Sequence, residues 1–267
     1  MKSSRALCAL LLGLLAPVSS ALADDEPRPA LRSHTEHRVR VGLGFHYSVG
    51  DYGGTSSTSI VYTPLTVRAE VGRWTLWGVL PYIRISGPGG FVQGPDGPVA
   101  TTGGVSDGLG DLLARGSYYL PSRYAWLPSL EPLVVVKFPT ASRDKGLGTG
   151  EFDFGVELGL TWEIERFMPF AVAGYRFLGS GPELPLDDVF EGVLGAQYAL
   201  ATGTNIGFLM DYREAASTQS GARLDAVPFA TFRVRSRWAI DLYASAGLAD
   251  GSPDAGVGFQ IAYSLGN

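Results

Sequence analysis

Side chains alternate in character along residues 108–159, and this alternation constrains the fold more than any other feature of the sequence. The apolar positions near its centre are Leu112, Ala114, Gly116, Tyr118 and Leu120, and between them lie Asp111, Leu113, Arg115, Ser117 and Tyr119. A period of two places alternate side chains on opposite faces of a β-strand. Because the pattern recurs at 130–139 and 152–162, we expect three strands here, each with one apolar face and one mixed or polar face.

The same period recurs along the rest of the chain. Further strands are predicted at 39–48, 60–71, 74–86, 170–178, 189–200, 205–213, 223–235, 238–248 and 255–265. This makes about twelve strands of roughly ten residues, the length that a tilted strand needs to cross a bilayer. Their apolar faces could pack together in a soluble sandwich, or face lipid in a membrane barrel whose polar side chains line a lumen.

The start of the chain favours the membrane barrel, because it has the organisation of a secretory signal peptide. Lys2 and Arg5 precede an apolar run at 6–18, and Ala21-Leu22-Ala23 supplies the small residues that a signal peptidase requires. We therefore predict a signal peptide at 1–23, a flexible periplasmic arm at 24–37 and a barrel at 38–267. The alternative for the arm is that it folds back as a plug. Cys8, the only cysteine, lies in the predicted signal peptide, so the mature chain is expected to contain no disulfide.

Composition excludes several other classes of protein. The chain has 26 acidic and 21 basic residues, and two of the basic ones lie in the predicted leader, so the exported chain is acidic and a poor candidate for nucleic-acid binding. Apolar runs beyond the leader end at Gly, Pro or a charge before they reach the length of a spanning helix. A closed barrel is then the structure that satisfies its backbone hydrogen bonds inside a bilayer. The predicted fold class is all-β, a transmembrane antiparallel up-and-down β-barrel.

The predicted connections alternate between short and long. The short ones lie at 72–73, 121–127, 163–166, 201–203 and 236–237, and the long ones, rich in Gly, Ser, Asp and Pro, at 49–57, 87–107, 140–150, 179–187, 214–221 and 249–254. Short periplasmic turns and longer external loops are typical of outer-membrane barrels. Beside the short connections lie Trp74, Trp77, Trp126, Trp162 and Trp238. We interpret them as an aromatic girdle at the periplasmic interface.

Three short motifs follow one another along the chain: Gly108-Leu109-Gly110-Asp111, Lys137-Phe138-Pro139-Thr140 and Gly146-Leu147-Gly148-Thr149-Gly150. In this order and spacing they resemble the transporter-like outer-membrane family labelled "meta-pathway of phenol degradation", most clearly over residues 105–181. The resemblance implies an outer-membrane barrel associated with uptake of aromatic or other hydrophobic compounds. Such barrels usually close on a terminal aromatic residue, whereas this sequence ends Tyr263-Ser264-Leu265-Gly266-Asn267. We therefore expect Tyr263 or Leu265 to serve in place of the terminal aromatic residue.

The polar faces of the strands should line the lumen, because a basic side chain in the middle of a bilayer would cost about 2–4 kcal/mol. The residues assigned to this face are Arg68, Arg84, Asp111, Arg115, Lys137, Asp153, Glu157, Arg176, Glu191, Asp211, Arg213, Asp225, Arg233 and Asp241. Two interpretations stay open: salt bridges that rigidify the barrel, or a mixed-sign channel wall. Glycines on the same face, such as Gly207 and Gly258, either leave space in the lumen or allow the sheet to curve.

The rival class is an outer-membrane lipid hydrolase, because His46 and Ser48 would share one face of a strand. Such an enzyme also needs a polar group that orients the histidine and an oxyanion pocket, and no asparagine lies on a neighbouring predicted strand. His34 and His37 are three residues apart on the predicted arm, and we interpret them as solvated rather than as a metal site. We therefore predict no enzymatic activity, no cofactor and no bound metal.

The predicted function is that of a channel in the bacterial outer membrane that passively admits small hydrophobic or aromatic organic solutes. The alternative is a non-conducting structural barrel, or one that binds at the cell surface through the loop at 87–107. The expected partners are outer-membrane lipids, the barrel assembly machinery and a small organic solute, with no nucleic acid.

Overall fold

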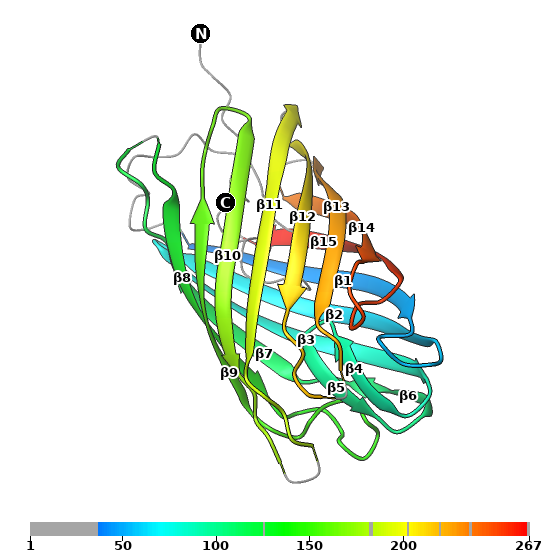
Figure 1. Cartoon of the computed structure of the whole chain (residues 1–267). Coiled ribbons are helices and arrows are strands. Elements are labelled where there is room, and N and C mark those ends of the chain that lie inside the picture. The colour runs from blue at the N-terminus through cyan, green and yellow to red at the C-terminus, as the bar shows by residue number, and fades with distance from the viewer. Residues whose placement is uncertain are drawn as a thin grey trace.

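The computed structural model describes residues 37–124, 126–181, 184–201, 203–218, 220–234 and 237–265, and these form a β-barrel (Figure 1). Its strands are β1 (His37–Gly50), β2 (Thr58–Val71), β3 (Trp74–Gly87), β4 (Gly90–Gly94), β5 (Gly97–Thr101), β6 (Gly104–Leu109), β7 (Leu112–Tyr118), β8 (Ser129–Phe138), β9 (Asp153–Thr161), β10 (Phe167–Phe177), β11 (Val189–Ala201), β12 (Thr204–Arg213), β13 (Arg223–Val234), β14 (Trp238–Gly247) and β15 (Ala255–Leu265). β4 and β5 form a separate two-stranded sheet. β6 and β7 both pair with β3, so they are two parts of one barrel strand, interrupted at Gly110-Asp111.

Each barrel strand pairs in antiparallel fashion with the next, and β15 pairs with β1 to close the ring. The closing register runs from Val39 opposite Leu265 to Val49 opposite Ala255. The thirteen strands of the main sheet include the two parts of one strand, so the prediction of a closed barrel of twelve antiparallel strands is confirmed. The predicted signal peptide and the arm up to residue 36 lie outside the described residues. Within the described part of the chain, no helix is long and apolar enough to span a membrane.

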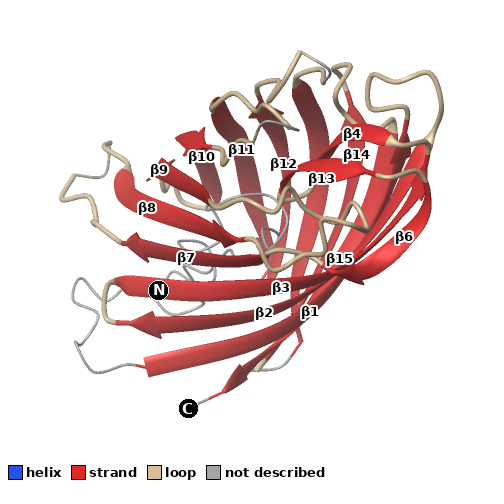
Figure 2. Cartoon of the chain, turned by 90° about the horizontal axis from the view of Figure 1, so that it is seen from below, coloured by secondary structure: helices blue, strands red, loops and turns tan. Residues whose placement is uncertain are grey.

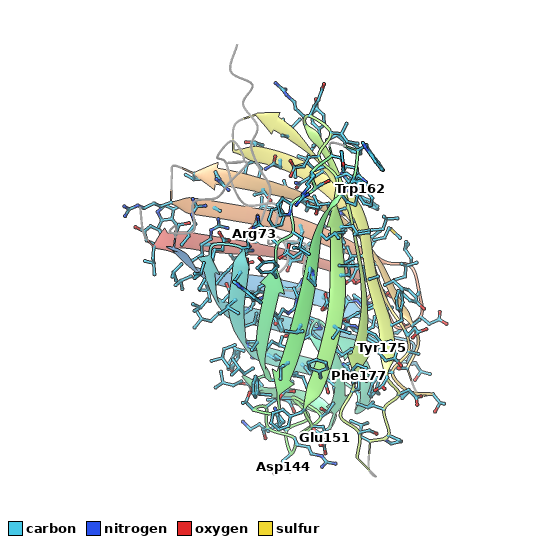
Figure 3. All side chains as sticks on the ribbon, turned by 90° about the vertical axis from the view of Figure 1, so that its left-hand side faces the viewer. Arg73, Asp144, Glu151, Trp162, Tyr175 and Phe177 are labelled. Atoms are coloured by element: carbon cyan, nitrogen blue, oxygen red, sulfur yellow. The ribbon has the colours of Figure 1, made fainter. Side chains whose placement is uncertain are left out.

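Short and long connections gather at opposite ends of the barrel. Arg73 and Trp162, in or beside short turns, lie at one end, whereas Asp144 and Glu151, in a long loop, lie at the other (Figure 3). We call these the turn end and the loop end. The alternation of connection lengths in the sequence therefore corresponds to the two rims of the barrel.

The outer face is apolar over the middle of the barrel. Exposed side chains on this face include Leu43, Leu65, Val134, Leu194 and Leu242. These side chains sit on different strands around the ring, so the apolar surface forms a band.

Two aromatic belts lie on the outer face. The belt at the turn end contains the pairs Trp74–Tyr118 and Trp238–Tyr263, each with ring centroids 4.8 Å apart. The second belt, toward the loop end, was not identified from the sequence and consists of Phe138, Phe152, Phe154, Tyr175, Phe177, Phe190 and Tyr212, which contact one another in pairs. An apolar band between two aromatic belts is the surface that a barrel presents to a bilayer.

On the inner face, aromatic rings from one strand cover glycines of the next. A Cβ added to Gly207 would lie 2.2 Å from a ring carbon of Phe229, and one added to Gly258 would lie 2.3 Å from a ring carbon of Tyr243. These glycines therefore do not leave open space in the lumen; they make room for rings that lie flat against the wall. An alanine at Gly207 would force the ring away, and overpacking of this kind typically costs about 1–3 kcal/mol.

Candidate functional site

Ionisable side chains fill much of the barrel interior. Of the fourteen residues assigned to the lumen, thirteen lie on the inner face: Arg68, Asp111, Arg115, Lys137, Asp153, Glu157, Arg176, Glu191, Asp211, Arg213, Asp225, Arg233 and Asp241. The inner face also holds Arg40, Glu70, Glu131 and Arg223, which are buried. These four follow the same alternation along their strands, so the period of two is the signal that identifies them as well.

The assignments of Arg84 to the lumen and of Trp77 to the outer girdle were wrong, because β3 faces the opposite way to the expectation. Arg84 is exposed on the outer face, whereas Trp77 is buried inside the barrel. There the guanidinium carbons of Arg68 and Arg115 lie 5.7 and 5.6 Å from the Trp77 ring centroid, within cation–π range. Large apolar residues occur on the inner face of β3, so hydrophobicity did not identify its lipid-facing side.

The other tryptophans of the predicted girdle lie at the turn end. Trp74, Trp126 and Trp238 are exposed, and Trp162 is partly exposed. They occupy the outer face or the rim, where an amphipathic ring can reach both lipid and water.

A layer of paired charges crosses the inner face of β10 to β13. Arg176 donates to one oxygen of Glu191 at 2.8 Å, and Arg213 lies 3.3 Å from the other oxygen of the same carboxylate. Arg223 contacts Asp225 at 2.5 Å. Wall carboxylates thus hold part of each guanidinium group, and we call Arg176, Arg213 and Arg223 the arginine triad.

The β4–β5 hairpin folds into the barrel and meets the arginine triad (Figure 2). Nη1 of Arg176 donates to the backbone carbonyl of Asp96 at 3.0 Å. Nη1 of Arg213 and Nη1 of Arg223 both donate to the carbonyl of Gly94, at 3.4 and 3.3 Å. Three guanidinium groups therefore hold the tip of the hairpin by its backbone.

Apolar contacts hold the sides of the hairpin. Val92 and Val99 belong to one buried cluster with Ile83 and Ile85 of β3. The side chain of Gln93 also donates to a backbone carbonyl in the loop after β12 at 3.2 Å. Between the hairpin tip and the charged wall, the cavity measures about 10 Å³, which is room for about one water molecule. The hairpin tip therefore packs closely against the charged wall.

The carboxyl group of Asp96 faces the wall from the hairpin tip. One oxygen accepts a hydrogen bond from the hydroxyl of Tyr62, and the other is enclosed with no hydrogen-bond partner in the described part of the chain. Burial raises the pKa of Asp96, and the Tyr62 hydrogen bond and the guanidinium groups of Arg115 and Arg176 oppose part of this rise. Docking of the hairpin therefore requires desolvation of a carboxyl group, which lowers the stability of the closed arrangement.

The three motifs that carry the family resemblance meet at the break between β6 and β7. Nζ of Lys137 lies 2.8 Å from Asp153 and 3.6 Å from Asp111, and it donates to the hydroxyl of Thr149 at 2.9 Å. Asp111 also accepts a hydrogen bond from the backbone of Ala141 at 2.9 Å. These contacts fasten the β8–β9 loop to the inner wall, so the motifs hold this loop in place.

His46 and Ser48, the residues of the hydrolase alternative, both lie buried on the inner face of β1. The His46 ring stacks on Tyr243, with centroids 5.7 Å apart, and none of the described residues forms a hydrogen bond with its Nδ1. The hydroxyl of Ser48 pairs with that of Tyr52 at 2.9 Å. A nucleophilic serine needs a base that is itself oriented by a third group, and an unpartnered Nδ1 does not provide this orientation.

The barrel resembles solved structures of outer-membrane proteins. An outer membrane channel from Pseudomonas putida F1 superposes with a TM-score of 0.70 at 14% identity, covering 90% of this chain and 100% of that one. The NanC porin gives 0.54 at 8% identity, with 85% and 100% covered. The translocator domain of the autotransporter NalP from Neisseria meningitidis gives 0.51 at 12% identity, with 88% and 90% covered.

No family model matches the sequence, and no curated protein matches it. The resemblance to the "meta-pathway of phenol degradation" family therefore stays a prediction. At these identities, the likeness to solved structures establishes the fold, which channels share with an autotransporter domain.

Proposed function

We propose that this protein is an outer-membrane channel that passively admits small organic solutes when the β4–β5 hairpin leaves the lumen. The observation that carries the proposal is the way in which the barrel is closed. A single hairpin lies inside the lumen, held at its tip by hydrogen bonds from the arginine triad, and the cavity between the tip and the wall has room for about one water molecule. Lids of this kind open and close on microsecond to millisecond timescales.

The inner wall carries both charged and apolar side chains, which favours solutes that combine a polar group with an apolar body. We include aromatic compounds among these solutes. Buried rings of Phe170, Phe229 and Tyr243 line the interior beside the paired charges. A twelve-stranded barrel lies between eight-stranded barrels filled by side chains and sixteen-stranded ones with water-filled channels. This size favours small solutes over polymers.

The proposed location is the bacterial outer membrane, reached through a cleaved signal peptide at 1–23. The apolar band and two aromatic belts on the outer face support lipid as the surrounding medium. We also propose the outer-membrane barrel assembly machinery as a partner, which would insert the closed ring of strands.

A non-conducting structural barrel is the second candidate, and the docked hairpin is the observation that favours it. Liposome swelling separates the two. We expect proteoliposomes to admit small solutes such as glycine and to exclude a dextran far wider than the barrel. Vesicles that stay sealed to every solute would support the structural barrel instead.

A further inference from the structure

The arginine triad divides its hydrogen bonds between the wall and the hairpin in a regular way. Each arginine contacts a wall carboxylate through Nε or Nη2, and each donates Nη1 to a backbone carbonyl of the hairpin tip. When the tip leaves, three Nη1 groups lose their acceptors together. Arg213 and Arg223 lie on the adjacent strands β12 and β13, and Arg176 lies on β10, which only β11 separates from β12. The three groups therefore point to one region of the lumen.

A further guanidinium group lines the same cavity. Arg115 is 6% exposed, and its Nε and Nη1 have no hydrogen-bond partner among the residues that the structure describes. A buried donor without an acceptor destabilises its surroundings, because its desolvation is not compensated by a hydrogen bond. The interior therefore favours an occupant that brings oxygen acceptors.

The charge balance around the cavity selects among oxygen-bearing groups. The wall offers Arg115, Arg176 and Arg213 against Glu157, Glu191 and Asp211, which is three charges of each sign. In the closed barrel the hairpin adds one carboxyl group, that of Asp96, and the hydroxyl of Tyr62 donates a hydrogen bond to it. An occupant with a single carboxylate brings the same number of carboxyl groups as the docked hairpin, whereas a dianion brings one negative charge more than the closed barrel holds.

The remainder of the cavity is apolar. Val172 and Val193 line it, and both belong to the buried cluster that contains Tyr62 and Phe170. These side chains can pack against a small apolar body but offer no partner for a chain of hydroxyl groups.

We infer that the hairpin tip occupies a binding site for small organic monocarboxylates, and that the arginine triad, Arg115 and Tyr62 determine this specificity. The inference rests on the proposed channel function for its biological meaning, but the site is testable without any transport measurement. A carboxylate that binds in place of the tip stabilises the undocked state and so exposes the hairpin.

The test measures how fast a cysteine on the hairpin is labelled. Gln93 is 1% exposed in the docked hairpin, so Gln93→Cys, made together with Cys8→Ala, reacts with a membrane-impermeant maleimide only after undocking. At pH 7.5, sodium benzoate at about ten times its dissociation constant should raise the labelling rate about ten-fold. The neutral amide benzamide and the cation benzyltrimethylammonium should leave it unchanged.

Two arginine variants with the same change of charge complete the test. Arg213→Gln should abolish the benzoate response, whereas Arg84→Gln, exposed on the outer face, should retain it. Thr102→Cys, exposed in the same loop, reports any effect of benzoate on the reagent itself.

The carboxylate site is overturned if benzoate accelerates labelling no more than benzamide does, or if Arg213→Gln responds like the parent protein. It is also overturned if Gln93→Cys stays unlabelled with every ligand, because the site would then never be vacated. A protein that responds to benzoate but leaves liposomes sealed retains the site and loses the channel, so the two failures are distinguishable.

Discussion

Removal of the β4–β5 hairpin should turn a barrel that carries little ion current into one with a large, continuously open conductance. The variant deletes residues 90–101 and joins Gly89 to Thr102 through two glycines. These ends already lie together, because a Cβ added to Gly89 would lie 3.2 Å from the backbone of Thr102. The barrel wall keeps its pairing of β3 with β6, so the change affects the plug and not the ring.

Single-channel recording in planar bilayers measures this effect. The physical reason for the increase is that water replaces Val92, Gln93, Val99 and the tip, which fill the interior at the loop end. A deletion of residues 55–56, which are exposed in the β1–β2 loop, serves as the matched control and should conduct like the parent protein. Equal currents from the hairpin deletion and the parent would show that the hairpin does not control the path.

Replacement of Lys137 by methionine should destabilise the barrel more than any other substitution discussed. Lys137 is 4% exposed and lies between the carboxylates of Asp111 and Asp153. Methionine keeps most of the side-chain volume but leaves two buried carboxylates without their cation. Removal of one member of a buried ion pair typically costs about 3–5 kcal/mol. The measurement is the urea midpoint of unfolding in detergent, followed by the mobility of folded and unfolded forms on gels.

Two further variants decide whether the lost ion pair is the cause. Lys145→Met removes a charge from the same β8–β9 loop, but Lys145 is exposed, so its effect should stay within about 0.5 kcal/mol. Adding Asp153→Asn to Lys137→Met should recover part of the stability, because one unpaired carboxylate is removed. An unfolding midpoint for Lys137→Met equal to that of Lys145→Met would refute the central role of this lysine.

The alternation of side chains was enough to predict the closed barrel and most of its inner face. The inward face of a strand could be assigned wherever charges mark one side of it, as Asp153 and Glu157 do on β9. β3 lacks that mark on its inner side, where Trp77, Ile83 and Ile85 lie. A period of two identifies the two faces but not which of them faces inward, so Arg84 was placed on the wrong side.

The hairpin inside the barrel was missed for a different reason. Gly94-Pro95-Asp96-Gly97 is a turn sequence between short apolar runs, and it indicates a local hairpin within the loop at 87–107. Its position inside the lumen depends on Arg176, Arg213 and Arg223, which lie 80 to 129 residues away along the chain. Local patterns carry no information about such contacts. From the sequence we could therefore predict the charged wall, but not that the β4–β5 hairpin lies against it.

The most direct test of the account is the current through a single barrel whose hairpin is first tied to the wall and then released. Gln93 donates to the carbonyl of Glu214 at 3.2 Å, so Gln93→Cys and Glu214→Cys, made together with Cys8→Ala, lie within reach of a short bis-methanethiosulfonate cross-linker, whose disulfide links a reductant cleaves. We predict that the cross-linked protein stays closed and that a reductant added to the same bilayer produces opening events. Current through the cross-linked barrel equal to that after reduction would contradict a channel closed by its own hairpin.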